Sequence, residues 1–420
     1  MIEGARKLDE DDALGWLRGE FHLTPGVIYL DGNSLGLLSK PAERALLDAL
    51  ETWKQSGIDG WLGGEHPWFN FAEELGALAA PLIGAERDEV LIAGSTSVNL
   101  HQVLASLFRP QGARNKILIE EDAFPTDAHV AKSHLKLRGL DPQRHLVVVP
   151  SRGGTALDEA DIVAAMTDAV AFAILPTALY RTGQLLDVEL LSEAARAKGI
   201  TLCLDACHSA GAVGHRFHAQ GVDCAVFCTY KYLNAGPGAV AGLYVHRKHH
   251  GSGPGLAGWF SSAKDRQFDM KNDLEPAATA GAYQIGTPHI LSMAPLLGSL
   301  ELVHRAGIGA LRARSLKLTG FMIDLAQREL APLGFAIATP REERRRGGHV
   351  ALRHPEAARL CKALKQRGVI PDFRPPDIVR LAPSPLYTSF AEVAEAVAIL
   401  GDIVREKRYL AFPNLREVVA

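Results

Sequence analysis

Two ionisable residues each follow an apolar run that predicts a buried strand. Asp205 ends the run ITLCLD, and Lys231 follows AVFCTY 26 residues further on. A lysine held against an apolar sheet can form a Schiff base with an aldehyde. A carboxylate at a neighbouring strand end is what a pyridinium nitrogen requires, because it keeps the ring protonated and electron-withdrawing. A solvent-reaching lysine and a helix-capping aspartate would explain each residue alone, but the pair predicts a pyridoxal phosphate site.

A phosphate site is then expected on the same molecule. The run EVLIAG leads into GSTSVNLHQVL, which indicates a strand, a hydroxyl-rich turn and a helix start. Ser95, Thr96 and Ser97 either cap that helix or hold an anion with hydroxyls and free backbone N–H groups. Further on, AFPTDAH offers Phe124 as a ring-stacking partner and Asp127 as a polar contact, although Phe124 could equally be a core residue.

The elements that position these residues form an alternating pattern from about residue 46 to 290. Seven short apolar runs alternate with helical segments such as DEADIVAAMTDAV and VELLSEAARAKG: EVLIAG, KILIEED, HLVVVPS, AVAFAILP, ITLCLDA, CAVFCTY and AGLYVH. Near-continuous apolar runs predict strands buried on both faces, hence an α/β domain with a mostly parallel, seven-stranded sheet covered by helices. Ligands of such sheets bind at the carboxyl ends of the strands.

After about residue 290 the pattern changes. Two long helical patterns precede strand candidates at FAIATP, HVALRHP and DIVRLAP, and a last helix is predicted at FAEVAEAVAILGDIVREK. We therefore expect a smaller α+β C-terminal domain at 290–420. The large cofactor-binding domain is expected at 46–289, with 1–45 as an N-terminal arm that packs with the small domain.

Composition limits the class of protein. The chain has 420 residues, 47% of them hydrophobic and 22% charged, with a net charge of −3, which is typical of a soluble globular protein. It gives no reason to expect nucleic-acid or membrane partners, and the cytoplasm is the expected compartment. The pairs Cys203/Cys207 and Cys224/Cys228 lack the tight knuckle of zinc sites, so we expect buried structural cysteines and no metal.

Several longer motifs resemble a known family. YLDGNSLGLL, GSTSVNLHQ, AFPTDAH, ALYRTGQLLD, LDACHSAGAV, CTYKYLNAGPG, GTPHILSM and VRLAPSPLYTSF occur in the order seen in kynureninases, over about residues 28–390. The resemblance implies an aminotransferase-like, fold type I pyridoxal-phosphate enzyme. It also implies a homodimer with an active site shared between subunits. Such enzymes hydrolyse L-kynurenine, or its 3-hydroxy derivative, to an anthranilate and L-alanine in tryptophan degradation.

The resemblance also assigns roles to single residues. Lys231 would bond the cofactor and serve as the base, Asp205 would pair with the pyridinium nitrogen, and Tyr230 would assist proton transfer. The other cofactor-binding residues implied are Thr96, Ser97, Phe124, Pro125, Thr126, Asp127, Thr177 and His208, with Trp259 and Thr287 lent by the partner subunit. The substrate-binding residues implied are Arg380 for the α-carboxylate, Trp61 and Asn33.

Two positions bear on the substrate ring. Relatives that prefer 3-hydroxykynurenine can carry histidine where this chain has Trp61, and asparagine where it has Thr287. Both residues resemble the kynurenine-preferring bacterial pattern. The chain departs from the family at Ser261 and Ser262, where Gly-His is usual, so the wall on the substrate side is less well defined by the resemblance.

Other functions remain as alternatives, one of them a kynureninase-like hydrolysis of a related aryl-keto amino acid. A desulfurase on the same fold needs a mobile active-site cysteine, whereas four of the five cysteines lie in or beside predicted buried strands. An aminotransferase would share the lysine and the aspartate. A cofactor-binding regulator without chemistry would need a module such as a DNA-binding domain, and none is visible in the sequence.

Overall fold

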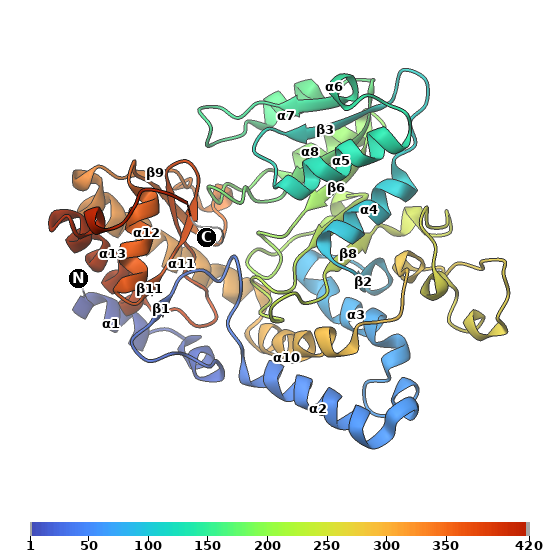
Figure 1. The fold of residues 1–420 in the computed structure, drawn as a ribbon, viewed down its shortest axis with the longest axis horizontal. Coiled ribbons are helices and arrows are strands. Elements are labelled where there is room, and N and C mark those ends of the chain that lie inside the picture. Colours follow the sequence, from blue (N-terminus) through green and yellow to red (C-terminus); the bar gives the residue numbers. More distant parts are fainter. Residues whose placement is uncertain (1, 417–420) are drawn as a thin grey trace.

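A single mixed sheet of seven strands forms the centre of the larger lobe in a computed structural model, which describes residues 2–416 (Figure 1). The strand order is β2-β8-β7-β6-β5-β3-β4; β8 runs antiparallel to both its neighbours, and the other pairs are parallel. The mostly parallel, seven-stranded sheet predicted from the sequence is confirmed. Its strands are β2 (Val90–Ile92), β3 (Lys116–Glu120), β4 (Leu146–Val149), β5 (Val170–Pro176), β6 (Thr201–Asp205), β7 (Cys224–Phe227) and β8 (Gly242–Val245).

Helices cover both faces of this sheet, as Figure 1 shows. Their starts follow local capping; for example, the Asp187 carboxylate accepts the N–H of Leu190 at the start of α8. The helix predicted over DEADIVAAMTDAV ends earlier, at Ala165, because residues 166–169 turn the chain into β5. The helices of this lobe are α2 (Lys40–Ser56), α3 (Phe71–Ile83), α4 (Thr96–Leu107), α5 (Pro125–Leu137), α6 (Pro142–His145), α7 (Glu159–Ala165), α8 (Val188–Ala197), α9 (Phe217–Gln220) and α10 (Ile290–Ala306).

A smaller lobe contains a four-stranded antiparallel sheet in the order β12-β13-β10-β9, together with the parallel pair β1-β11. Three of these strands were predicted, whereas β1, β11 and β12 were not. The elements are β1 (Ile28–Tyr29), β9 (Ala336–Ile337), β10 (Val350–Arg353), β11 (Val369–Ile370), β12 (Asp372–Arg374), β13 (Ile378–Leu381), α1 (Ile2–Glu10), α11 (Ile308–Leu325), α12 (Ala357–Gln366) and α13 (Phe390–Arg405).

Two hydrophobic cores correspond to the two lobes. The larger core surrounds the seven-stranded sheet and includes buried residues of α10, whereas the smaller core is built mainly from the C-terminal elements. Helix α11 contributes to both, with Leu311 in the larger core and Leu318 in the smaller one. At the N-terminus, the Asp9 carboxylate of α1 accepts the N–H groups of Phe390 and Ala391 at the start of α13. The domain bounds given above stay predictions.

Two further features concern the burial of the cysteines and the search for a helix that could span a membrane. All five cysteines are buried as free thiols, which confirms the predicted burial of the pairs Cys203/Cys207 and Cys224/Cys228. Among residues 2–416, no helix combines the length and the apolar character needed to cross a bilayer.

Candidate active site

Lys231 and Asp205 lie at the carboxyl ends of two neighbouring parallel strands. Asp205 is the last residue of β6, and Lys231 follows β7 in a tight turn. Both residues are buried, with 7% of the surface of Asp205 and 8% of that of Lys231 exposed. The Lys231 Nζ lies 3.0 Å from the His208 Nε2 and 5.7 Å from the centre of the Phe124 ring. Burial lowers the pKa of His208 well below its usual value, so its neutral ring can accept a hydrogen bond from the lysine.

The two carboxylates of the site have different surroundings. The Asp205 Oδ1 accepts the backbone N–H of Cys207 at 2.8 Å, which holds the side chain in place at the strand end. Asp127, in the first turn of α5, is 2% exposed, and its Oδ1 is a buried atom with no hydrogen-bond partner. Burial, followed by the charge of Asp205, raises the pKa of Asp127 well above its usual value. This oxygen is therefore available to a polar group of a bound ligand.

The start of α4 offers hydroxyl groups to an anion. Ser95 is the N-cap, because its side chain accepts the N–H of Val98 at 3.3 Å. Ser97 and Thr126, from the starts of α4 and α5, have hydroxyl oxygens 3.1 Å apart. The side chains of Thr96 and Ser97 are therefore not needed for capping, and the helix dipole favours negative charge beside them.

Aromatic rings border the lysine. Phe124 is 40% exposed and meets Tyr180 edge-on, with ring centres 5.6 Å apart. Pro125 follows Phe124 as the first residue of α5, where its fixed φ suits a helix start. One face of Phe124 is thus held in place while the ring stays accessible, as a stacking partner for a planar ligand would be.

Arg380 on β13 is brought to this site from the small lobe. It is 1% exposed and donates hydrogen bonds to the Tyr180 carbonyl oxygen at 2.5 Å and the Ser34 hydroxyl at 2.9 Å. It also pairs with Asp372, while its Nε is buried without a partner. Asn33, in the same loop as Ser34, is fully buried, and both polar atoms of its side chain lack partners.

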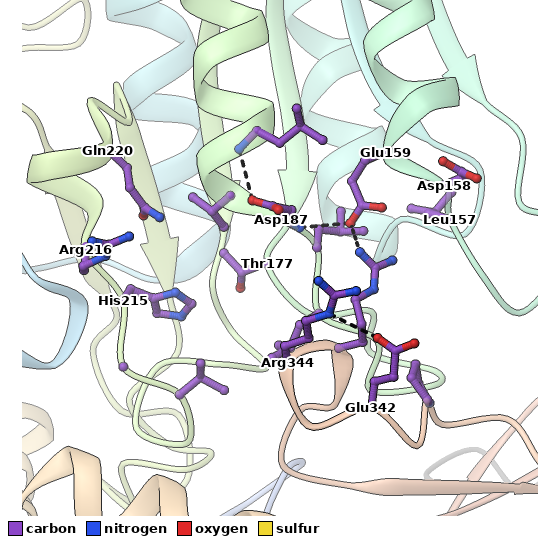
Figure 2. A pocket seen from close by; sticks show the side chains of 18 of the residues that line it. Leu157, Asp158, Glu159, Thr177, Asp187, His215, Arg216, Gln220, Glu342 and Arg344 are labelled. Carbon is purple, nitrogen blue, oxygen red and sulfur yellow. Dashed lines mark hydrogen bonds and ion pairs between the residues drawn. The ribbon is translucent and has the colours of Figure 1, made fainter.

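Thr177, the residue after β5, lies on the edge of this group. Its N–H donates to the Asp205 carbonyl oxygen at 2.9 Å, and its hydroxyl lies 2.6 Å from that of Ser209. Thr177 also lines a cavity of about 920 Å³ that Figure 2 shows between α7, α8 and the loop at 340–345. No other predicted site residue lines that cavity, and its Arg345 and Arg344 are paired with Glu159 and Glu342.

Three of the residues predicted for the active site have no described contact with Lys231 of the same chain. Trp61 packs against Trp68 and Phe260, with ring centres 5.8 Å and 6.4 Å away. Trp259 is 49% exposed, and Thr287 lines a cavity of about 500 Å³ beside the start of α4. Within residues 2–416, no described hydrogen bond or ring contact joins Trp61, Trp259 or Thr287 to Lys231.

Other residues of the site were not singled out from the sequence. Tyr180 and Ser34 lie within quoted motifs, ALYRTGQLLD and YLDGNSLGLL, so the motifs carried a signal for them. Asp31, beside Ser34, has its pKa raised to about 6 by burial and by the charge of Asp372. Asp372 itself gave no signal, because it follows β11 outside any motif and its role depends on its contact with Arg380.

The fold and the site together define a class of protein. The chain has the fold of a solved cysteine desulfurase from Thermococcus onnurineus NA1, with a TM-score of 0.76 and 19% identity over 93% of this chain and 98% of that one. It is equally similar to a mutant of C-DES described with glycine covalently linked to its pyridoxal phosphate cofactor, with a TM-score of 0.77 and 19% identity over 92% and 99%. The chain thus has the aminotransferase-like, fold type I architecture of pyridoxal-phosphate enzymes.

Closer similarity gives the family. The chain is 56% identical to the kynureninase of Geobacillus thermodenitrificans (strain NG80-2) over 419 residues, covering 100% of this chain and 98% of that protein. It is 54% identical to the kynureninase of Bacillus anthracis, again over 100% and 98%. Residues 311–400 match the model of the kynureninase C-terminal domain. The chain belongs to the kynureninase family.

Proposed function

We propose that this protein hydrolyses L-kynurenine to anthranilate and L-alanine, and 3-hydroxykynurenine to 3-hydroxyanthranilate more slowly. The observation that carries the proposal is that Asp205 and Lys231 lie at the carboxyl ends of the adjacent strands β6 and β7 in a chain of this family. The reaction belongs to tryptophan degradation, and we place it in the cytoplasm.

The residues fit pyridoxal phosphate, which is the cofactor. Thr96, Ser97 and Tyr230 would hold its phosphate, Phe124 would stack on its ring, and Asp205 would face its ring nitrogen. Pro125, Thr126, Asp127, Thr177 and His208 would complete its surroundings. The buried, unpartnered Oδ1 of Asp127 and Nδ1 of His208 support this fit, because each needs a partner that the protein does not supply. When bound, the cofactor supplies an electron sink for bond cleavage next to the substrate amine.

The protein's own groups would handle the protons. Lys231 would hold the cofactor through its amine, and the same amine would take and return the proton at the substrate Cα. The Asp205 carboxylate would keep a proton on the ring nitrogen. Burial, followed by the nearby Cys228, raises the pKa of Tyr230, so the phenol is protonated at neutral pH and suits a proton donor.

Arg380 would bind the substrate α-carboxylate, with Asn33 beside it. Its free, buried Nε–H supports this role, and its contacts with Tyr180 and Ser34 orient the guanidinium. A planar guanidinium suits a bidentate pair with a carboxylate.

Arg380→Lys is expected to raise KM for kynurenine by about ten- to a hundredfold, because one charged hydrogen bond is worth about 1.5–3 kcal/mol and lysine cannot make the bidentate pair. Cofactor content should change little. Steady-state kinetics and the absorbance of bound cofactor measure the two effects. The control is Arg353→Lys, on the neighbouring strand β10, where the arginine is paired with Asp377 at the surface. Equal weakening toward an analogue without the carboxylate would contradict the assignment.

A homodimer with a shared site is the second part of the proposal. Large apolar side chains are exposed on the segment that carries Trp259, namely Trp259, Phe268, Met270 and Leu274. Such surface is commonly covered by a partner. In the proposed dimer, Trp259 and Thr287 of one subunit would reach the cofactor phosphate of the other.

Mixing two inactive variants tests the shared site. Lys231→Ala and Trp259→Ala subunits, unfolded and refolded together, are expected to regain activity, because a mixed dimer contains one site built only from unaltered residues. Each variant refolded alone is the control. If the mixture is no more active than its components, each site is built from one subunit.

The substrate ring should also be discriminated. Trp61 has a broad apolar face with one N–H donor and no acceptor for a 3-hydroxyl group. Burying a hydroxyl without a partner costs about 1–3 kcal/mol, so kcat/KM should favour kynurenine by about ten- to a hundredfold. Trp61→His with Thr287→Asn should narrow or reverse the preference. The ratio of kcat/KM values for the two substrates is the measurement, and a wild type that favours 3-hydroxykynurenine would show this interpretation to be wrong.

One assay tests the proposed reaction itself. The purified protein with pyridoxal phosphate is incubated with L-kynurenine, and anthranilate and alanine are quantified separately. Equimolar release of both supports the hydrolysis. L-cysteine serves as the comparison substrate because the solved proteins of this fold include desulfurases. Sulfur release from cysteine without anthranilate release from kynurenine would overturn the proposal.

A further inference from the structure

Four of the five cysteines form two pairs across the neighbouring strands β6 and β7. Cys203 and Cys224 are directly opposite each other in the parallel register. Cys207 and Cys228 each lie four residues further along, past the strand ends, and their sulfur atoms are 3.2 Å apart. We call Cys203/Cys224 the inner pair and Cys207/Cys228 the outer pair.

The outer pair contacts the predicted phosphate site. The hydroxyl of Thr96 lies 3.3 Å from the Cys228 sulfur and 3.8 Å from the Cys207 sulfur. Cys207 also donates its backbone N–H to Asp205. The two thiols therefore lie directly beneath the first turn of α4 and beside the carboxylate that faces the site.

The two pairs differ in their surroundings. Both cysteines of the inner pair are 0% exposed, whereas Cys207 and Cys228 are 5% and 3% exposed. The hydrogen bond between the outer thiols, followed by the positive charge of Lys231 and the Thr96 hydroxyl, lowers the pKa of Cys228. In the inner pair, the hydrogen bond with Cys224 and burial raise the pKa of Cys203. The hydrogen bond between the outer thiols, followed by burial, raises the pKa of Cys207. Because the thiolate is the reactive form, Cys228 is the attacking sulfur of the outer pair.

We propose that Cys207 and Cys228 are a modification site, at which a hydroperoxide converts the two thiols into a reversible disulfide. The Cys228 thiolate attacks one peroxide oxygen, the O–O bond breaks, and water or an alcohol leaves. The Cys207 sulfur then attacks the Cys228 sulfur, the S–S bond forms, and the hydroxyl leaves as water. Two thiols thus supply two electrons and two protons to one hydroperoxide. A small dithiol reverses the bond by exchange.

Oxidation should also loosen the cofactor. When the outer pair becomes a disulfide, neither sulfur retains a hydrogen, so neither can donate a hydrogen bond to the Thr96 hydroxyl. The contacts that orient the Thr96 hydroxyl are then weakened. This consequence rests on the proposed role of Thr96 in holding the cofactor phosphate, whereas disulfide formation itself does not.

The test treats reduced holoenzyme with tert-butyl hydroperoxide and then alkylates it under denaturing conditions. We expect two of the five thiols to escape alkylation, a peptide linking Cys207 to Cys228, and full alkylation after dithiothreitol. Cys207→Ser should abolish the link, and the matched inner-pair variant Cys203→Ser should retain it. The wild-type peptide map decides the matter even if a variant fails to fold. Five alkylated thiols, a Cys203–Cys224 link, or oxidation beyond sulfenic acid without a link would overturn the proposal.

The cofactor consequence has its own measurement. After gel filtration, the oxidised protein should retain less bound cofactor by absorbance than the reduced protein, and reduction followed by added cofactor should restore it. If the disulfide forms and retention is equal, the inferred effect on Thr96 is wrong. Anthranilate release by the reduced enzyme is a separate readout, so failure of the proposed function would be seen independently.

Discussion

Lys231→Ala is expected to reduce anthranilate release by at least about a thousandfold, because one amine is proposed as both the cofactor anchor and the base. General base catalysis alone typically contributes about 10²–10⁴-fold. The side chain makes a single described hydrogen bond, to His208, so its loss should cost folding only about 0.5–1.5 kcal/mol. We therefore expect a folded, inactive protein, as measured by circular dichroism and the kynurenine assay.

Chemical labelling checks the same assignment without a mutation. Borohydride reduction of the wild-type holoenzyme, followed by peptide mass mapping, should place the cofactor label on Lys231. Lys264→Ala is the matched control, because Lys264 is also partly buried among aromatic rings, with its Nζ 4.3 Å from the centre of Phe260. The control should be labelled at Lys231 as the wild type is. A label on any other lysine would contradict the assignment.

Asp205→Asn is expected to keep most of the bound cofactor and to lose turnover by about ten- to a hundredfold or more. The asparagine oxygen can still accept the Cys207 N–H, so the strand end should keep its shape. Its amide, however, is neutral and cannot hold a proton on the ring nitrogen. A charged hydrogen bond is worth about 1.5–3 kcal/mol, and each 1.36 kcal/mol of barrier is about tenfold in rate.

The matched control for this variant is Asp187→Asn. Like Asp205, Asp187 is an aspartate whose carboxylate accepts a backbone N–H. It differs in position, because it caps the start of α8. Asparagine is nearly as good an N-cap, so kcat and the melting temperature should change little. Turnover numbers for both variants, with cofactor content measured by absorbance, make the comparison. Normal turnover in Asp205→Asn would mean that another residue faces the ring nitrogen.

The large sheet could be predicted because its strands are locally distinctive. A run such as VAFAILP is buried along its whole length in β5, so its apolar residues mark it without reference to the rest of the chain. The short strands β1, β11 and β12 could not be predicted. The pairing of β1 with β11 joins residues far apart in the sequence, such as Ile28 with Val369, so no local pattern signals it.

The sequence by itself determined that Lys231 and Asp205 would lie at the same edge of the sheet, because the carboxyl ends of parallel strands share one edge. Tertiary structure alone decided the surroundings of Arg380, whose burial depends on Tyr180 and Ser34, 200 and 346 residues away in the chain. It also decided that Cys207 would meet Cys228 beneath Thr96. Such contacts depend on how whole elements pack against one another, which no local pattern of residue types encodes.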